Sequence, residues 1–238
     1  MQHHVAPVVP PASSGVTLDG VTPDRSADPF RILFVCTGNI CRSAMAERHT
    51  RAYLDQHLGQ DAGEVIVGSA GTRAVVGGDM HPYSAMVLEG FGGDATGFRA
   101  RDLQPALAAQ ADLVLTMTPD HRGVVLGMAP RALPRSFTLL EAADLLELVD
   151  PGAELVGDTF AARCRAMVKA MSRVRSRRPS GRPDQVRDPN GRALEVHQQV
   201  GGVIATALEP VLARLVSLHD SAAAAEAETI ERSQPDAS

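Results

Sequence analysis

The chain is poor in aromatic residues: among its 238 residues there is no Trp, Tyr occurs twice, and aromatic residues make up 3%. Hydrophobic residues still account for 44%, so we expect one domain of ordinary size with a mainly aliphatic core. The sequence lacks a run of about 18 apolar residues, and its N-terminus lacks a basic region followed by an apolar one. These absences predict no membrane partner and no signal peptide.

Cysteine is also scarce, with Cys36, Cys41 and Cys164 as the whole set. Three cysteines are too few for a disulfide scaffold and fit a reducing compartment, so a cytoplasmic location is expected. The net charge of −5 gives no general attraction to nucleic acid. The histidines His81, His121 and His197 show no metal-ligand spacing, so neither a metal nor a cofactor is expected. The oligomeric state stays open.

Composition divides the chain into three parts. Residues 1–29 are rich in Pro, Ser and Gly and predict a disordered extension, whereas residues 30–219 carry the apolar patterns of a folded domain. Residues 220–238 are rich in Ala, Glu and Ser and predict a flexible tail. Within the domain, residues 172–187 hold six arginines and two prolines. We expect a solvated basic loop there, with recruitment of an acidic substrate as the alternative.

Short apolar runs alternate with helical patterns through the domain. The runs Ile32–Val35, Val65–Val67, Leu113–Met117 and Phe137–Leu139 read as buried strands, and a long amphipathic pattern covers about Arg192–Leu218. This alternation predicts an α/β fold with a doubly wound parallel sheet. In such sheets ligands bind beyond the carboxyl ends of the strands, which is where the segment after the first strand would lie.

That segment holds a cysteine and an arginine six residues apart. Cys36-Thr37-Gly38-Asn39-Ile40-Cys41-Arg42-Ser43 lies between the first strand and a predicted helix over 43–58. Inward backbone N–H groups and the helix N-terminus form an anion cradle that favours a thiolate. Cys36 would be the nucleophile, and Arg42 offers a planar fork for phosphate oxygens. The pattern predicts phosphate-ester chemistry through a covalent thiol intermediate.

The other loop residues have predicted roles of their own. Gly38 permits a positive φ and close approach of an anion, and Asn39 tolerates the left-handed conformation and can lock the loop through its amide. Ser43 can cap the helix or donate a hydrogen bond to the thiolate. Cys41 is either a redox partner that protects Cys36 or a small hydrophobic loop residue.

The string from Val35 to Glu47 resembles the N-terminal signature of the low-molecular-weight protein tyrosine phosphatases. The stretches Gly68–Thr72, Phe98–Leu103 and Ala111–Met117 agree with it. The resemblance implies a flavodoxin-like sheet and metal-free hydrolysis of a phosphotyrosine protein or a small phosphomonoester. Cys36 would form a phosphocysteine, and Arg42 would hold the phosphate with the loop residues Thr37, Gly38, Asn39, Ile40, Cys41 and Ser43. A network through Asn39 and Ser43 would reach Ser69.

The resemblance also implies a general acid in an Asp-Pro pair ahead of the last helix. Asp188-Pro189 directly precedes that helix, and we therefore assign Asp188 as the acid; Asp150-Pro151 remains the alternative because of its distance from Cys36. Such a group typically contributes about 10²–10⁴-fold to the rate.

Two departures from the family pattern affect substrate binding and the loop network. Asn190 and Arg73–Val76 stand where aromatic residues are common in the family, which leaves Ile40 as one apolar wall. Phe98 stands where many members carry a histidine, so the network is expected to end at Ser69.

Two other functions fit the same loop. A thiol-linked arsenate reductase needs two further cysteines, but only Cys164 is present after the loop. A non-catalytic phospho-ligand module would not need the nucleophile and the acid.

Overall fold

The computed structural model describes residues 29–150 and 155–233, and it describes the side chains as far as residue 221. The extension expected at residues 1–29 therefore lies outside the described residues except for Pro29. The strands are β1 (Phe30–Cys36), β2 (Val65–Gly71), β3 (Leu113–Thr116) and β4 (Ser136–Thr138). The helices are α1 (Arg42–Leu58), α2 (Pro82–Gly90), α3 (Pro105–Gln110), α4 (Pro119–Met128), α5 (Leu139–Leu148), α6 (Phe160–Val174) and α7 (Leu194–Ser233). Three short 3₁₀ helices, Gly59–Glu64, Pro130–Arg135 and Arg175–Arg177, complete the set.

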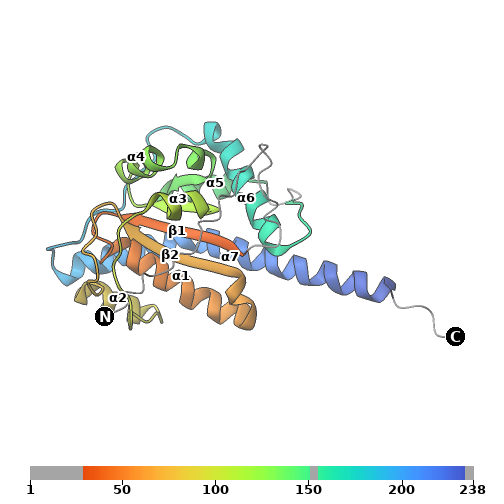
Figure 1. The fold of residues 1–238 in the computed structure, drawn as a ribbon, viewed down its shortest axis with the longest axis horizontal. Coiled ribbons are helices and arrows are strands. Elements are labelled where there is room, and N and C mark those ends of the chain that lie inside the picture. The colour runs from red at the N-terminus through yellow and green to blue at the C-terminus, as the bar shows by residue number, and fades with distance from the viewer. Residues whose placement is uncertain (1–28, 151–154, 234–238) are drawn as a thin grey trace, which may run out of the picture.

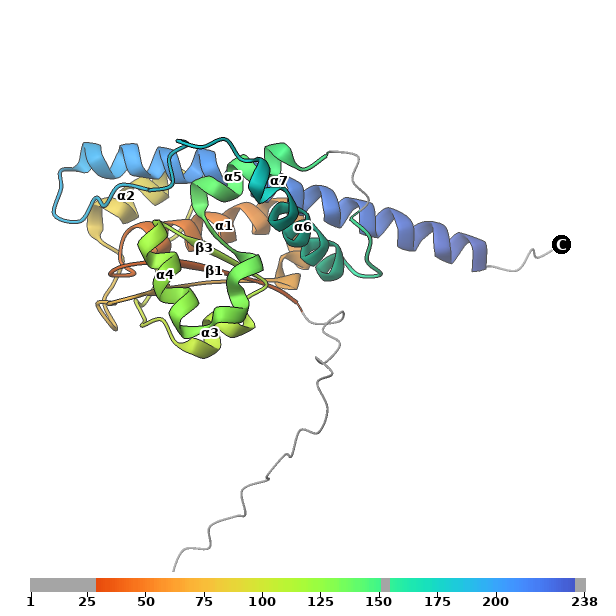
Figure 2. The ribbon, with the colours of Figure 1, turned by 90° about the horizontal axis from the view of Figure 1, so that it is seen from above.

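The four strands of the described residues form one parallel sheet in the order β2-β1-β3-β4. Helices cover both faces: α1, α5 and α7 lie on one side of the sheet, and α3 and α4 lie on the other (Figures 1 and 2). This arrangement confirms the predicted doubly wound, flavodoxin-like α/β fold. All four predicted strands are present. Strands β1 and β2 extend beyond their predicted bounds, β3 ends one residue earlier, and β4 is shifted by one residue.

The alternation of side chains along β1 explains the two covered faces. Ile32 and Phe34 belong to the larger core under α1 and α7, whereas Leu33 and Val35 belong to a smaller core under α3 and α4. Since successive strand residues point to opposite faces, a strand buried on both sides must be apolar throughout. Cys36 ends this strand at its carboxyl edge.

Helix α7 is longer than the sequence pattern predicts. It continues to Ser233 rather than ending near Leu218, because the Ala- and Glu-rich sequence after residue 220 consists of strong helix formers. The helix projects past the rest of the fold (Figure 1), and the expected flexible tail is therefore helical as far as the structure describes it. Leu194–Ser221 is long and apolar enough to cross a membrane by length and composition. Its apolar stripe packs into the core, where Val200, Ile204, Leu208 and Leu215 are buried.

The basic segment 172–187 is less solvated than expected. Arg175 pairs with Glu141 at 2.9 Å and lies over the ring of Phe137. Arg178 pairs with Asp144 at 2.8 Å and with Asp184 at 2.6 Å. The positive charges of these two arginines are therefore compensated within the fold, and the prediction of a solvated loop is wrong for them.

Candidate active site

The carboxyl ends of β1, β2 and β3 open into a cavity of about 870 Å³. Its walls come from the loops that follow these strands and from the segment ahead of α7. The lining residues are Thr37, Arg42, Thr72, Arg73, Thr118, Asp120, His121, Val124, Gln185, Val186, Arg187 and Asp188. The predicted cradle thus lies at the ligand-binding edge of a doubly wound sheet.

Cys36 is buried at the entrance of the loop, with 2% of its surface exposed. Its Sγ lies 2.9 Å from the Oγ of Ser43. Helix α1 begins at Arg42, its N-cap is Cys41, and no side chain caps it. Of the two roles predicted for Ser43, the structure therefore shows contact with the thiol and not capping.

Asn39 holds the loop together. It is the only described non-glycine residue with a positive φ, at 55°, and it is fully buried. Its Nδ2 donates to Ser43 Oγ at 2.9 Å and to Ser69 Oγ at 2.7 Å, and its Oδ1 accepts from the backbone N–H of Arg101 at 2.9 Å. Because Asn39 already donates to Ser43, the hydroxyl proton of Ser43 is free to point at the Cys36 sulfur.

Gly38 does not use the positive φ that glycine permits, because the left-handed residue of the turn is Asn39. One expectation about the loop is wrong. The network continues beyond Ser69, whose hydroxyl donates to Glu47 at 2.5 Å. A carboxylate on α1 thus ends the hydrogen-bond chain. Glu47 and Arg101 both stand in the stretches that carry the family resemblance, but spacing alone gave no role for either.

Arg42 and Asp188 meet in the cavity. Arg42 is 4% exposed, and its Nη2 lies 2.7 Å from Asp188 Oδ2. Its Nη1 donates to the Val186 carbonyl at 3.1 Å, whereas its buried Nε has no hydrogen-bond partner in the described residues. The Asp188 side chain is 49% exposed, so its carboxylate can reach a group entering from solvent.

The two competing residues lie elsewhere. Asp150 follows α5, which ends at Leu148, and it is not among the residues that line the cavity. Cys164 lies fully buried in α6, and burial raises the pKa of its thiol. It is therefore poorly suited to a relay of oxidation from Cys36.

His121 is a cavity residue whose role the sequence did not reveal. Its Nε2 lies 2.9 Å from Thr37 Oγ1, and its Nδ1 lies 2.9 Å from Thr118 Oγ1. Burial, with the nearby Arg42 cation as the second cause, lowers the pKa of His121 to about 4. The neutral imidazole therefore fixes the Thr37 side chain at the start of the phosphate loop.

The mouth of the loop is aliphatic. Ile40 is half-buried, and Val75 lies beside it, with 53% of its surface exposed and its N–H bonded to the Gly38 carbonyl. Arg73 and Val124 face the cavity itself. The described lining contains no Phe or Tyr, which agrees with the departures seen in the sequence.

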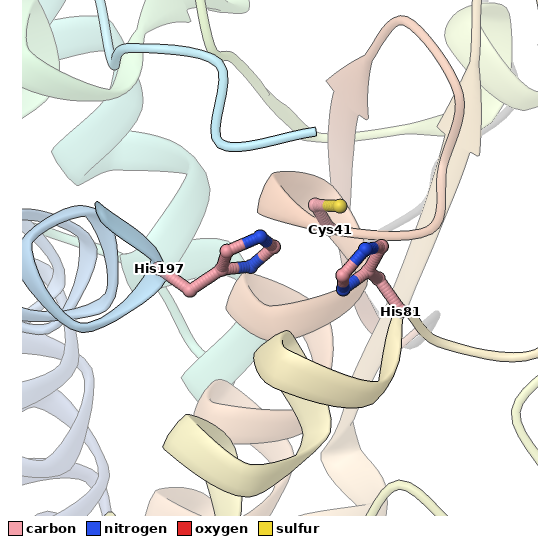
Figure 3. Close-up of side chains that lie close together, drawn as sticks. All are labelled: Cys41, His81 and His197. Carbon is pink, nitrogen blue, oxygen red and sulfur yellow. The ribbon is translucent and has the colours of Figure 1, made fainter. Parts of the chain in front are cut away.

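Cys41 does not line the catalytic cavity; its thiol lies close to two histidines. Figure 3 shows the rings of His81 on the α2 side and His197 on α7 converging on the Cys41 thiol. One ligand-type atom from each residue lies within 4.8 Å of the others. Residues that are 40 and 156 positions from Cys41 are thus brought to the base of the phosphate loop, a grouping that sequence spacing concealed.

A buried thiol in an anion-binding loop, an arginine fork and an aspartate at the carboxyl edge of a flavodoxin-like sheet define a cysteine-dependent phosphatase. The sequence profile described as "Low molecular weight phosphotyrosine protein phosphatase" matches residues 31–176. The chain belongs to that family. The arsenate reductase and non-catalytic alternatives are not favoured by the relatives described next.

Two curated relatives and one solved structure illustrate the match. A protein-arginine-phosphatase from Geobacillus stearothermophilus is 38% identical over 111 residues, which cover 47% of this chain and 70% of the relative. A low molecular weight protein-tyrosine-phosphatase from Streptomyces coelicolor is 32% identical over 130 residues, covering 51% and 77%. The YwlE arginine phosphatase, in a mutant with a phosphorylated active site serine, aligns with a TM-score of 0.55 and 25% identity, covering 78% of this chain and 95% of that one.

Proposed function

We propose that this protein is a phosphatase that hydrolyses phosphotyrosine in proteins through a phosphocysteine on Cys36. The observation that carries the proposal is the ion pair in the cavity between Arg42 Nη2 and Asp188 Oδ2, which lie 2.7 Å apart. Arg42 stands on the loop that also holds Cys36. The nucleophile, the phosphate fork and the acid come from β1, the start of α1 and the segment before α7, and the fold alone brings them together.

The geometry supports a two-step reaction. Phosphate binding would satisfy the free Nε of Arg42 and compete with Asp188 for its fork, which leaves the carboxyl group to face the leaving oxygen. The Cys36 sulfur attacks phosphorus, the P–O bond to tyrosine breaks, and the phenolic oxygen takes a proton from Asp188. Water then attacks the phosphocysteine and gives a proton back to Asp188, which releases phosphate and the thiolate.

Hydrolysis of para-nitrophenyl phosphate by matched variants tests these roles. We expect Cys36→Ser to abolish turnover and Asp188→Ala to lower kcat by about 10²–10⁴-fold. Asp150→Ala is the matched control and should stay within about twofold of wild type, because Asp150 does not line the cavity. Loss of rate in Asp150→Ala with full rate in Asp188→Ala would reverse the assignment of the acid.

Phosphoarginine is the second candidate substrate. The described cavity lining has no Phe or Tyr, yet it includes the carboxylates of Asp120 and Asp188, and carboxylates pair well with a guanidinium group. One of the relatives is named as an arginine phosphatase. The apolar contact offered by Ile40 and Val75 at the loop mouth favours the phenol ring instead.

The ratio of kcat/KM for matched phosphotyrosine and phosphoarginine peptides separates the two substrates. We expect the phosphotyrosine peptide to be preferred and Asp120→Asn to leave its turnover unchanged. A preference for the phosphoarginine peptide that Asp120→Asn weakens would establish the second candidate.

A further inference from the structure

The face of the phosphate loop turned away from the catalytic cavity carries three potential metal ligands. Cys41 comes from the loop itself, His81 is the N-cap residue of α2, and His197 lies in the first turn of α7. Cys41 and His197 are buried, with 4% and 0% of their surfaces exposed, and His81 is half-buried. The three side chains point toward one another (Figure 3).

The hydrogen bonds around His197 leave one of its nitrogens unused. Its Nδ1 lies 2.9 Å from the hydroxyl oxygen of Ser84, whereas its buried Nε2 makes no hydrogen bond of normal geometry in the described residues. The Pro189 backbone is the other polar group close to the ring. Metal-binding histidines usually have one ring nitrogen held in this way while the other coordinates the ion. A fully buried nitrogen without a partner is costly unless a ligand meets it.

We propose that Cys41, His81 and His197 form a Zn²⁺ site at the base of the phosphate loop, independent of the proposed phosphatase reaction. One thiolate and two imidazoles suit this borderline-soft ion, and three protein ligands leave a fourth position for water. Binding would form one Zn–S bond and two Zn–N bonds and release the Cys41 proton to solvent. Burial raises the pKa of Cys41 to about 11, so zinc must displace that proton as it binds.

Coordination requires one local change at His81. Its Nδ1 accepts a hydrogen bond from the backbone N–H of Tyr83 at 3.2 Å, and its ring stacks on that of His197 with centroids 4.5 Å apart. The ring can bind zinc through Nδ1 by giving up this N–H, or through Nε2 after the proton moves to Nδ1. Either route replaces one long capping bond by a metal bond and turns the two rings out of their stack.

The site would join three segments that surround the catalytic cavity. Cys41 directly precedes Arg42, and the His81 N–H already donates to the Ile40 carbonyl at 2.7 Å. His197 lies nine residues after Asp188 on the same stretch of chain. Zinc would therefore hold the phosphate loop, the start of α2 and the end of the acid segment as one unit, and it would occupy the thiol of Cys41.

Cobalt(II) titration of the full-length protein tests the site, because cobalt bound to a thiolate gives a charge-transfer band in the near ultraviolet. The protein carries Cys36→Ser, so that the band cannot come from the nucleophile. We expect one cobalt per chain, displaced by Zn²⁺, and loss of the band in the added variant Cys41→Ala. His197→Gln and His81→Gln should each weaken binding by at least about tenfold.

His57→Gln is the matched control and should bind as well as its parent, since His57 lies on the exposed side of α1 and bonds to the Tyr53 carbonyl. Circular dichroism with chelator present checks that each variant is folded, and His81→Gln decides alone if His197→Gln does not fold. The proposal is overturned if the folded parent gives no thiolate band, or if the band persists unchanged in the histidine variants, which would indicate adventitious binding to a thiol.

Discussion

Replacement of Asn39 should destabilise the whole domain, and the choice of replacement shows why. Asn39→Ala removes three hydrogen bonds of the buried amide, to Ser43, Ser69 and Arg101. At about 1 kcal/mol each, these bonds amount to about 3 kcal/mol. Alanine at φ 55° adds strain of about 1 kcal/mol, which brings the expected loss of unfolding free energy to about 4 kcal/mol.

Asn39→Gly separates the hydrogen bonds from the strain. Glycine accepts the positive φ, but it gains entropy in the unfolded chain, worth about 0.5–1 kcal/mol. The strain and entropy terms nearly cancel, so the glycine and alanine variants should lie within about 1 kcal/mol of each other, both far below wild type. Such a loss is a large part of the 5–15 kcal/mol typical of a native domain.

Urea unfolding followed by far-ultraviolet circular dichroism measures the effect, since the chain has no Trp. With a slope of about 2 kcal/mol per molar urea, the midpoint should fall by about 1.5–2 M for both variants. Asn190→Ala changes the other, exposed asparagine and should shift the unfolding free energy by less than about 0.5 kcal/mol. If Asn39→Gly unfolds within 1 kcal/mol of wild type, the amide bonds contribute little and backbone strain is the main effect of alanine.

Two further predictions concern a residue that lines the cavity and a glycine packed against the start of the phosphate loop. Burial lowers the pKa of His121 from 6.5 to about 4. Between these pH values the unfolded chain binds more protons than the folded one, so stability falls as the pH drops through this window. His121→Gln should remove up to about 3 kcal/mol of this pH dependence, measured from urea midpoints between pH 7 and 4. In Gly71→Ala the new Cβ would overlap the Thr37 carbonyl oxygen, so its melting temperature and phosphatase rate should both fall. Gly123→Ala on α4 meets open space and should keep or raise stability; equal melting temperatures for the two alanine variants would refute the overlap.

The sequence was most informative where a function depends on neighbours in the chain. Cys36, Arg42 and Ser43 share one loop between a strand and a helix, so their spacing alone placed them together. The strands were predictable for a similar reason, because a parallel sheet covered on both faces requires continuous apolar runs. Asp188 was singled out only through the resemblance and the long amphipathic helix that follows it; the structure places it beside Arg42, and its role as the acid stays a prediction.

Contacts between distant segments could not be read from spacing. His121 contacts Thr37 across 84 positions, and the Asn39 Oδ1 accepts from Arg101 across 62. The packing of the helices on the sheet decides which polar residues point into the interior. The local sequence pattern does not predict this choice. The same reason hid the grouping of Cys41 with His81 and His197, since the spacing of the histidines along the chain predicted no metal site.

The ion pairs of the basic segment help to hold the chain ahead of Asp188. The family profile ends at residue 176, and the chain beyond it reaches the cavity at Gln185. Arg178, with its side chain 12% exposed, anchors the start of this path on Asp144 and Asp184. Val186 anchors its end, because its N–H donates to the Met117 carbonyl at 2.8 Å while its own carbonyl accepts from Arg42.

The Arg178–Asp144 pair is partly buried, and such pairs contribute more than exposed ones. Of the six arginines in residues 172–187, only Arg187 lines the described cavity. An electrostatic field that recruits an acidic substrate needs uncompensated charge near the site. The positive charges of Arg175 and Arg178 are instead compensated by ion pairs with carboxylates of the fold. The contacts of the segment therefore support the position of Asp188 beside Arg42 rather than a field that recruits an acidic substrate.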